Sequence, residues 1–136
     1  MAKNVTPDEL VDELTKDFEA LFRGIGVEAS NRIIDKAPVS TGALRASIRA
    51  SVNSEIVSYS KDDVDPSGQK TKLLNESAIR DAKDGDKINI VVGAPYGKQL
   101  EEGTSTRAPL AFVRSTGEEL SSIVETVITN LRKYRD

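Results

Sequence analysis

The stretch Ala37-Pro-Val-Ser-Thr-Gly-Ala-Leu-Arg-Ala-Ser-Ile48 decides how this chain folds. It places a turn, Pro38 to Gly42, between a long helical pattern and a short alternating one. A second stretch, Val92-Gly-Ala-Pro-Tyr-Gly-Lys-Gln-Leu-Glu-Glu-Gly-Thr104, repeats the same design downstream. Each stretch joins a glycine, which allows the backbone to turn, to short apolar segments. This design suits loops that dock onto a sheet, and neither stretch contains a catalytic motif.

The residues before the turn predict a long helix. Thr6-Pro-Asp-Glu9 forms a capping box with proline at the first helical position. Apolar residues then recur at spacings of three and four, which predicts an amphipathic helix that ends at Lys36, before Pro38. Gly24 and Gly26 interrupt this pattern and indicate a bend or a close approach between the helix and the sheet.

The residues after the turn predict short strands. Alternation around Ile48, Ala50 and Val52 indicates a half-buried strand within residues 44–59. A second strand is predicted at residues 88–93, a helical turn at 96–102 ended by Gly103, and an edge strand at 108–113.

Residues 61–87 are the most polar part of the chain. Thirteen of these 27 residues are charged, and the segment also contains Pro66, Gly68 and Gly85. This composition predicts a mobile loop insertion that orders on assembly, although residues 73–83 could form a short helix.

The C-terminal residues predict a second helix. Ser115-Thr-Gly-Glu118 reads as another capping box, and the apolar face that follows includes Val124, Val127 and Leu131. We therefore predict one α+β domain over residues 1–136. Its long N-terminal helix and its C-terminal helix pack on one face of a small, mainly antiparallel sheet, with the mobile loop inserted at 61–87.

Composition excludes several functional classes. The chain has no Cys and no His, which excludes disulfides, Cys/His zinc sites and nucleophiles that rely on histidine. Its net charge is −3, and no concentrated basic face for nucleic acid is evident. No apolar run is long enough to span a bilayer, and no signal-peptide core begins the chain. We expect a protein made in a cytoplasm, without membrane attachment, cofactor, metal or catalytic activity.

Three motifs in the sequence loosely match functional sites, and each has a plainer interpretation. Residues 63–68 match the opening of a calcium loop, but Leu74 stands where a bidentate Glu is needed, so an acidic solvated turn is preferred. Glu101 and Glu102 are adjacent on a helix and point in different directions, which favours a solvated helix end. The residue types of a Ser–Lys nucleophile also occur, at Ser40, Thr41, Ser47 and Lys36. Nothing in their spacing brings the lysine to a hydroxyl, so we prefer hydroxyls that hydrogen-bond to the backbone of their own turn.

Three separated elements together resemble a known family, the head–tail joining or neck (tail-completion) proteins of long-tailed bacteriophages, also described as a tail-component family of lambdoid phages. The first element comprises Ala37, Pro38, Thr41, Gly42, Leu44, Arg45, Ser47 and Ile48. The second comprises Val92, Gly93, Tyr96, Glu102, Gly103 and Thr104, with Leu100 inside it, and the third comprises Pro109, Phe112 and Arg114. One departure is Glu102, where family members often carry an aromatic residue.

The resemblance implies a structural virion protein, from a free phage or a prophage, and these same residues as its interface and structural motif. It implies a homo-oligomeric ring, expected to be a hexamer, at the connector or the tail terminator. The expected partners are neighbouring head-completion proteins and tail tube or terminator proteins, with DNA only passing through the lumen. The alternative is a small protein-binding adaptor or regulatory module without catalysis, and a hydrolase that uses only carboxylates ranks third.

Overall fold

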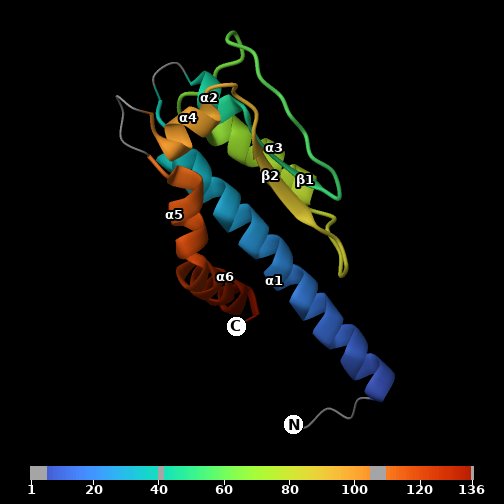
Figure 1. Cartoon of the computed structure of the whole chain (residues 1–136). Helices are drawn as coiled ribbons and strands as arrows, with labels where there is room; N and C mark the ends of the chain where they lie inside the picture. The colour runs from blue at the N-terminus through green and yellow to red at the C-terminus, as the bar shows by residue number, and fades with distance from the viewer. Residues whose placement is uncertain (1–5, 40–41, 105–109, 136) are drawn as a thin grey trace.

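The computed structural model describes residues 6–39, 42–104 and 110–135. The elements follow one another as α1 (Pro7–Lys36), α2 (Ala43–Ala46), β1 (Ile48–Val52), α3 (Gln69–Ile79), β2 (Ile88–Val92), α4 (Gly97–Glu102), α5 (Phe112–Glu118) and α6 (Leu120–Arg135). The predicted α+β class is confirmed, with a long N-terminal helix, a C-terminal helix and an antiparallel sheet. In Figure 1, α1 runs between the sheet on one side and α5 with α6 on the other.

Helix α1 begins and ends where the sequence predicts. The backbone N–H of Glu9 donates to Thr6 Oγ1, and the N–H of Thr6 donates to the Glu9 carboxylate, both at 3.2 Å. Its 30 residues end at Lys36. The two internal glycines mark close approaches: a Cβ on Gly26 would lie 2.8 Å from Ile88 Cδ1 of β2, and one on Gly24 would collide with Val127 of α6.

The sheet has two strands, and it is smaller than predicted. Strands β1 and β2 pair in antiparallel register, with Ile48 opposite Val92 and Val52 opposite Ile88. The predicted continuation of the first strand to Tyr59 is wrong, because the chain turns at Asn53, whose φ is 60°. The following segment returns along β2, where Asn89 Nδ2 donates to the Ser54 carbonyl at 2.9 Å.

Two predictions near the C-terminus are also wrong. Phe112 begins a helix, α5, instead of ending an edge strand; residues 105–109 lie outside the described residues. Ser115 lies inside α5, so it does not cap the final helix, which begins at Leu120. The cap of α5 comes from a distant residue, described below.

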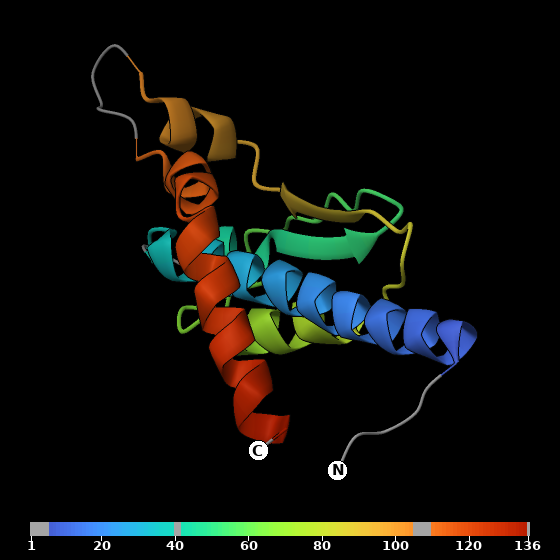
Figure 2. The same ribbon diagram turned by 90° about the horizontal axis from the view of Figure 1, so that it is seen from below.

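Helix α6 packs against α1 and α5, and α1 separates it from the sheet (Figure 2). Ile123 and Val127 are buried in this contact, whereas Val124 and Leu131 are half-buried. An ion network fastens the same contact: Glu119 lies 2.9 Å from Lys36 Nζ and 3.4 Å from Arg32 Nη1. These two cations lower the pKa of Glu119.

The predicted mobile insertion at residues 61–87 needs correction. It contains the 11-residue helix α3, which packs against both α1 and β1. Thr71, Asn75 and Ile79 are spaced at intervals of four and are buried against the rest of the fold. The segment is therefore a structural layer that covers the sheet. The high number of charged residues pointed to a loop, because the buried face of α3 is narrow and two of its three residues are polar.

Asn75 joins α3 to the outer edge of β1. The side chain is 1% exposed, and its Oδ1 accepts a hydrogen bond from the Ala50 N–H at 3.0 Å. Its Nδ2 donates to the Ile48 carbonyl at 3.0 Å and to Ser30 Oγ at 3.1 Å. One amide thus serves two strand groups that β2 does not reach, in the manner of a neighbouring strand.

We expect Asn75→Ala to destabilise the protein strongly. A buried backbone group left without a partner costs about 1–3 kcal/mol, and this substitution strands both Ala50 N–H and Ile48 C=O. Chemical denaturation would measure the free energy of unfolding. Ser77→Ala, on the exposed face of the same helix, is the matched control and should change it by less than about 0.5 kcal/mol. Equal effects of the two substitutions would contradict this role.

Candidate functional site

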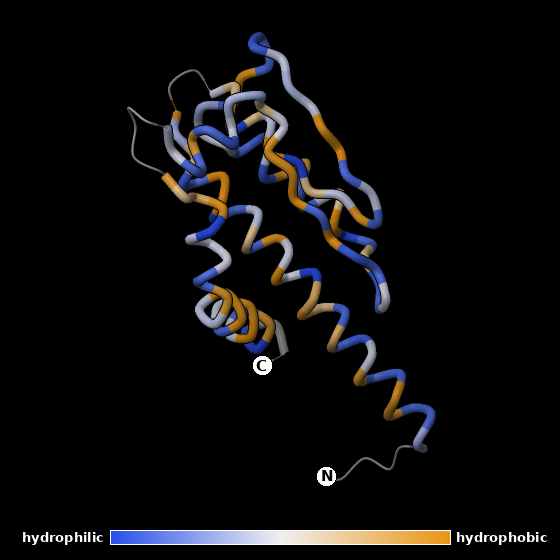
Figure 3. The backbone as a smooth tube through the Cα atoms, in the orientation of Figure 1, coloured by the Kyte–Doolittle hydropathy of each residue, from blue (hydrophilic) through white to orange (hydrophobic). Residues whose placement is uncertain are grey.

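The three sequence elements that carry the resemblance converge at one end of the molecule. Leu44, Ile48, Leu100 and Phe112 are buried there in one cluster, and Tyr96 packs against it. The other members are Ile33, Ile34, Ala37 and Ala94. Side chains separated by more than 60 positions in the sequence thus form a common core. In Figure 3 the backbone of α4 is mostly hydrophilic, in keeping with the burial of its Leu100 alone among its large side chains.

Arg45 holds the end of α1 against the neighbouring loops. Its guanidinium donates to the carbonyl of Ala37 at 3.0 Å, to that of Asp35 at 3.1 Å and to that of Pro66 at 3.0 Å. Two of these acceptors are carbonyls at the C-terminus of α1, where a positive charge interacts favourably with the helix dipole. The third belongs to the segment that leads into α3. One side chain therefore connects α1, α2 and the approach to α3.

The turn around Gly42 requires glycine for two reasons. Its φ is 82°, a left-handed conformation that side chains disfavour, and a Cβ there would lie 2.6 Å from the nitrogen of Pro66. The Gly42 carbonyl accepts a hydrogen bond from the Asp65 N–H at 3.0 Å. Two contacts therefore join the turn region to the segment before α3: this backbone hydrogen bond and the one from Arg45 to the Pro66 carbonyl.

Ser47 links the two sequence stretches directly. Its Oγ donates to the Leu44 carbonyl at 2.7 Å and accepts from the Ala94 N–H at 3.1 Å. The Ser47 carbonyl accepts from the Gly93 N–H at 3.0 Å. These bonds extend the β1–β2 pairing toward α4 and give the Ser47 hydroxyl a donor and an acceptor role within the fold.

Glu101, not Glu102, has a specific structural task. Its two carboxylate oxygens accept from the N–H groups of Val113 and Arg114, each at 2.9 Å. The carboxylate thereby caps the N-terminus of α5 from another helix, and the prediction that both glutamates lie at a solvated helix end is wrong for Glu101. No local pattern could have revealed a cap that comes from a residue twelve positions away.

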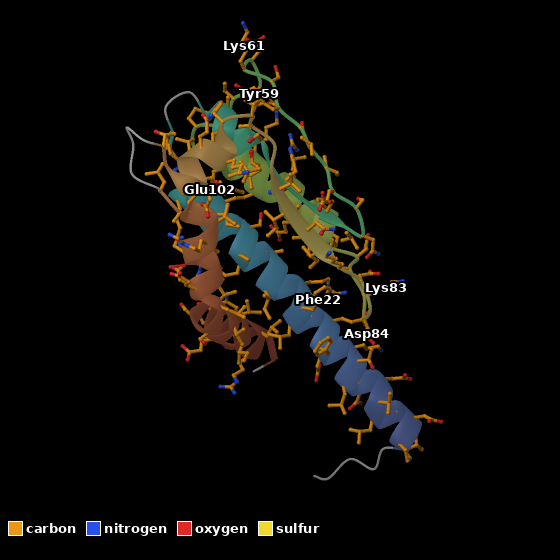
Figure 4. All side chains as sticks on the ribbon, in the orientation of Figure 1. Phe22, Tyr59, Lys61, Lys83, Asp84 and Glu102 are labelled. Carbon is orange, nitrogen blue, oxygen red and sulfur yellow. The ribbon has the colours of Figure 1, made fainter. Side chains whose placement is uncertain are left out.

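The remaining motif residues divide by burial. Gly103 ends α4, as predicted, and its N–H donates to the Gln99 carbonyl at 2.8 Å. Pro38 is half-buried after α1, whereas Glu102, Thr104 and Arg114 are exposed at the same end of the molecule (Figure 4 labels Glu102). The predicted residues Thr41 and Pro109 lie outside the described residues.

Two tyrosines connect this end to the segment that returns along β2. The rings of Tyr59 and Tyr96 meet edge to face, with centroids 5.8 Å apart and planes at 88°. Burial, together with a side-chain hydrogen bond shared with Tyr59, raises the pKa of Tyr96. Because Tyr59 is exposed while Tyr96 packs on the core, the pair joins the surface to the interior.

Among the candidate catalytic and metal groups, Lys36 and Asp65 make contacts elsewhere in the fold, and Ser40 and Thr41 lie outside the described residues. Lys36 Nζ donates to Ser115 Oγ at 3.0 Å and does not meet Ser47. Asp65 accepts from both the N–H and the hydroxyl of Thr71, each at 2.7 Å, and so holds the start of α3. Within the part of the chain that the structure describes, no group of three or more potential metal ligands occurs.

A second candidate surface lies at the other end of the molecule. The first turns of α1, residues 7–18, extend beyond the rest of the fold, and we call them the arm (Figure 1). Its apolar side chains Leu10, Val11, Leu14 and Phe18 are all exposed; Leu14 and Phe18 each expose 58% of their surface. The sequence predicted core packing for this part of the stripe, and that prediction is wrong for the described chain. Contiguous exposed apolar residues are typical of an interaction site.

Searches of protein-family models, curated proteins and solved structures found no match to this chain. None of the helices in residues 6–39, 42–104 and 110–135 combines the length and apolar character needed to cross a membrane.

We expect Arg45→Lys to lower the free energy of unfolding by about 2 kcal/mol or more, because a lysine cannot replace three fixed charged hydrogen bonds. Thermal or chemical denaturation would measure the loss. Arg114→Lys is the matched control, since Arg114 is an exposed arginine at the same end of the molecule and should tolerate lysine. An Arg45→Lys protein as stable as the unmodified chain would contradict this role of Arg45.

Asp65 should contribute to acid sensitivity. Burial alone would raise its pKa, but the hydrogen bonds from Thr71 and from the Gly68 N–H, together with the charge of Lys70, outweigh burial and lower it. The stabilisation is therefore present above the unfolded pKa, near 3.9, and is lost as pH falls through the lower folded value. Asp65→Asn keeps an acceptor oxygen without the titration, so stability should fall less steeply below about pH 4. Denaturation at a series of pH values tests this, and an unchanged slope would be the contrary result.

Proposed function

We propose that this protein is a structural subunit of the neck or tail-completion complex of a long-tailed bacteriophage, where copies form a ring that joins tail to head. The observation that carries the proposal is the convergence of the three family-like elements in one frame. Leu44, Arg45, Ser47, Leu100 and Phe112 make packing and hydrogen-bond contacts there. These residues support a shape that presents surfaces to other proteins, as expected of an assembly subunit.

The distribution of exposed apolar side chains supports assembly. The arm presents its apolar stripe at one end, while Leu110 and Val113 are exposed beside α4 and α5 at the other. Cyclic symmetry requires a heterologous contact, in which two different patches of one subunit meet their counterparts on its two neighbours. A chain with separate exposed patches at opposite ends meets this requirement.

The charge of the chain supports a conduit for DNA. The 22 acidic and 19 basic residues give a net charge of −3. Because the basic side chains are not concentrated on one face, they would make few contacts with DNA phosphates. DNA that passes through the lumen would therefore bind only weakly. In this proposal the lasting partners are other copies and the adjacent head-completion and tail proteins.

Deletion of this gene from a phage or prophage that carries it should yield unjoined heads and tails, or tails of faulty termination. Electron microscopy of lysates and plaque counts would measure this effect. Complementation with the Gly117→Ala gene is the control, because a Cβ at Gly117 would meet no other part of the fold within 4 Å. Normal infectious particles from the deletion would defeat the proposal and favour the adaptor alternative.

A further inference from the structure

A groove runs along the middle of the molecule between α1, α3 and α6. It consists of two adjoining hollows, of about 220 and 430 Å³, that share Gly24, Val27 and Glu76. The apolar side chains that line it are Val27, Ile79, Val127 and Leu131. Concave apolar surfaces between helices are suited to accept a further helix, which inserts side chains at intervals of three and four.

The groove also contains a polar atom without a partner. Asn31 lines the larger hollow, and its buried Oδ1 has no hydrogen-bond partner among the described residues. A buried acceptor without a donor is costly, and most such atoms in proteins have one. Because this oxygen is covered in the single copy, an occupant would be favoured if it turned the Asn31 side chain into the hollow and offered it a hydroxyl or amide donor together with an apolar face.

The arm has such a face. Val11, Leu14, Thr15 and Phe18 are spaced as i, i+3, i+4 and i+7, so they share one side of the helix. They line an open hollow of about 390 Å³ together with Asp84, which Figure 4 labels beside α1. The hydroxyl of Thr15 lies in the middle of this apolar face and can donate a hydrogen bond.

We propose that the arm of one copy lies in the α1–α3–α6 groove of the next copy. This inference rests on the proposed ring and names the contact that builds it. A copy cannot fill its own groove, because the arm and the groove residues Gly24 to Asn31 belong to the same continuous helix. The occupant must come from another chain, and each copy offers one arm and one groove.

Charge favours this pairing over arm against arm. The arm carries five carboxylates and one lysine, so two arms would repel each other. The groove is bordered by Arg23 and Arg80, and Arg132 with Lys133 is exposed near its α6 end. Of its carboxylates, Glu28 is paired with Arg32 at 2.7 Å, which leaves Glu76. Two arginines and two glutamates line the hollows, so the positive charge that complements the acidic arm comes mainly from Arg132 and Lys133 beside them.

The arrangement predicts how assembly depends on concentration. The contact is heterologous, so it generates a closed ring or an open filament according to the rotation between copies. A contact built from four side chains of the arm is small, so an isolated pair would be weak. Closure holds each copy on two sides, which makes the ring far more stable than the pair.

Disulfide trapping tests the contact in the full chain, which has no native cysteine. Leu14→Cys combined with Leu131→Cys should give a ladder of linked copies on non-reducing gels after treatment with diamide. Leu14→Cys combined with Leu120→Cys is the matched control and should give none, because Leu120 is exposed at the far end of α6 from the groove. Leu14→Cys alone tests arm against arm, and a linked dimer from it would overturn the proposal.

Surface substitutions test the same contact without thiols. Leu14→Glu should raise the concentration needed for half-assembly at least tenfold in analytical ultracentrifugation, with an unchanged melting curve, because Leu14 is exposed in the single copy. Val57→Glu, at a more exposed apolar residue away from the arm, should leave assembly unchanged. Thr15→Val keeps the shape and removes the donor, and should weaken assembly severalfold.

The outcomes separate this contact from the proposed function. Rings that form without the Leu14–Leu131 link, and tolerate Leu14→Glu, would overturn the arm-in-groove contact and leave the proposed function standing. A chain that remains monomeric at every concentration would overturn both. The ladder, together with the loss of assembly in Leu14→Glu, supports the contact whether or not the particle is a phage neck.

Discussion

The fold depends on the three hydrogen bonds of the Arg45 guanidinium. A 30-residue helix ends with unpaired carbonyls, and these need donors before the chain can turn sharply. Arg45 supplies donors to Asp35 and Ala37 and, with the same planar group, to Pro66. The direction of β1 and the start of α3 both follow from where α1 stops. A single cation therefore fixes the relation between the longest helix, the sheet and the layer that covers it.

Hydrogen bonds of polar side chains complete the frame. Asn75 satisfies the open edge of β1, Ser47 extends the strand pairing, and Glu101 caps α5. Aromatic residues are few, so the aliphatic core alone would allow sliding between layers; directional bonds specify one arrangement. The residues that carry the family resemblance therefore pack against and hydrogen-bond to each other. The side chains that could contact a partner protein are those that this frame leaves exposed.

Sequence reasoning succeeded where the determinants are local. The capping box at Thr6 and the proline after Lys36 define α1, and alternation around Ala50 identifies β1. It failed where polar groups find distant partners. Glu101 caps a helix through a loop, and α3 buries Thr71 and Asn75, residue types that normally indicate a surface. Composition marked residues 61–87 as a loop because a narrow buried face contributes little to an average over 27 residues.

The arm shows a different limit of periodicity. Its apolar stripe has the same spacing as the buried part of α1, and that spacing is the same whether the covering surface belongs to this chain or to another. Gly24 and Gly26 bring α6 and the sheet close to the second half of the helix, and none of the other described elements extends far enough to cover the first half. A helix that exceeds its own domain leaves apolar surface in water, which costs about 25 cal/mol for each Å² that another molecule could cover. The length of α1, more than any single residue, therefore accounts for the exposed apolar surface on which the proposed assembly rests.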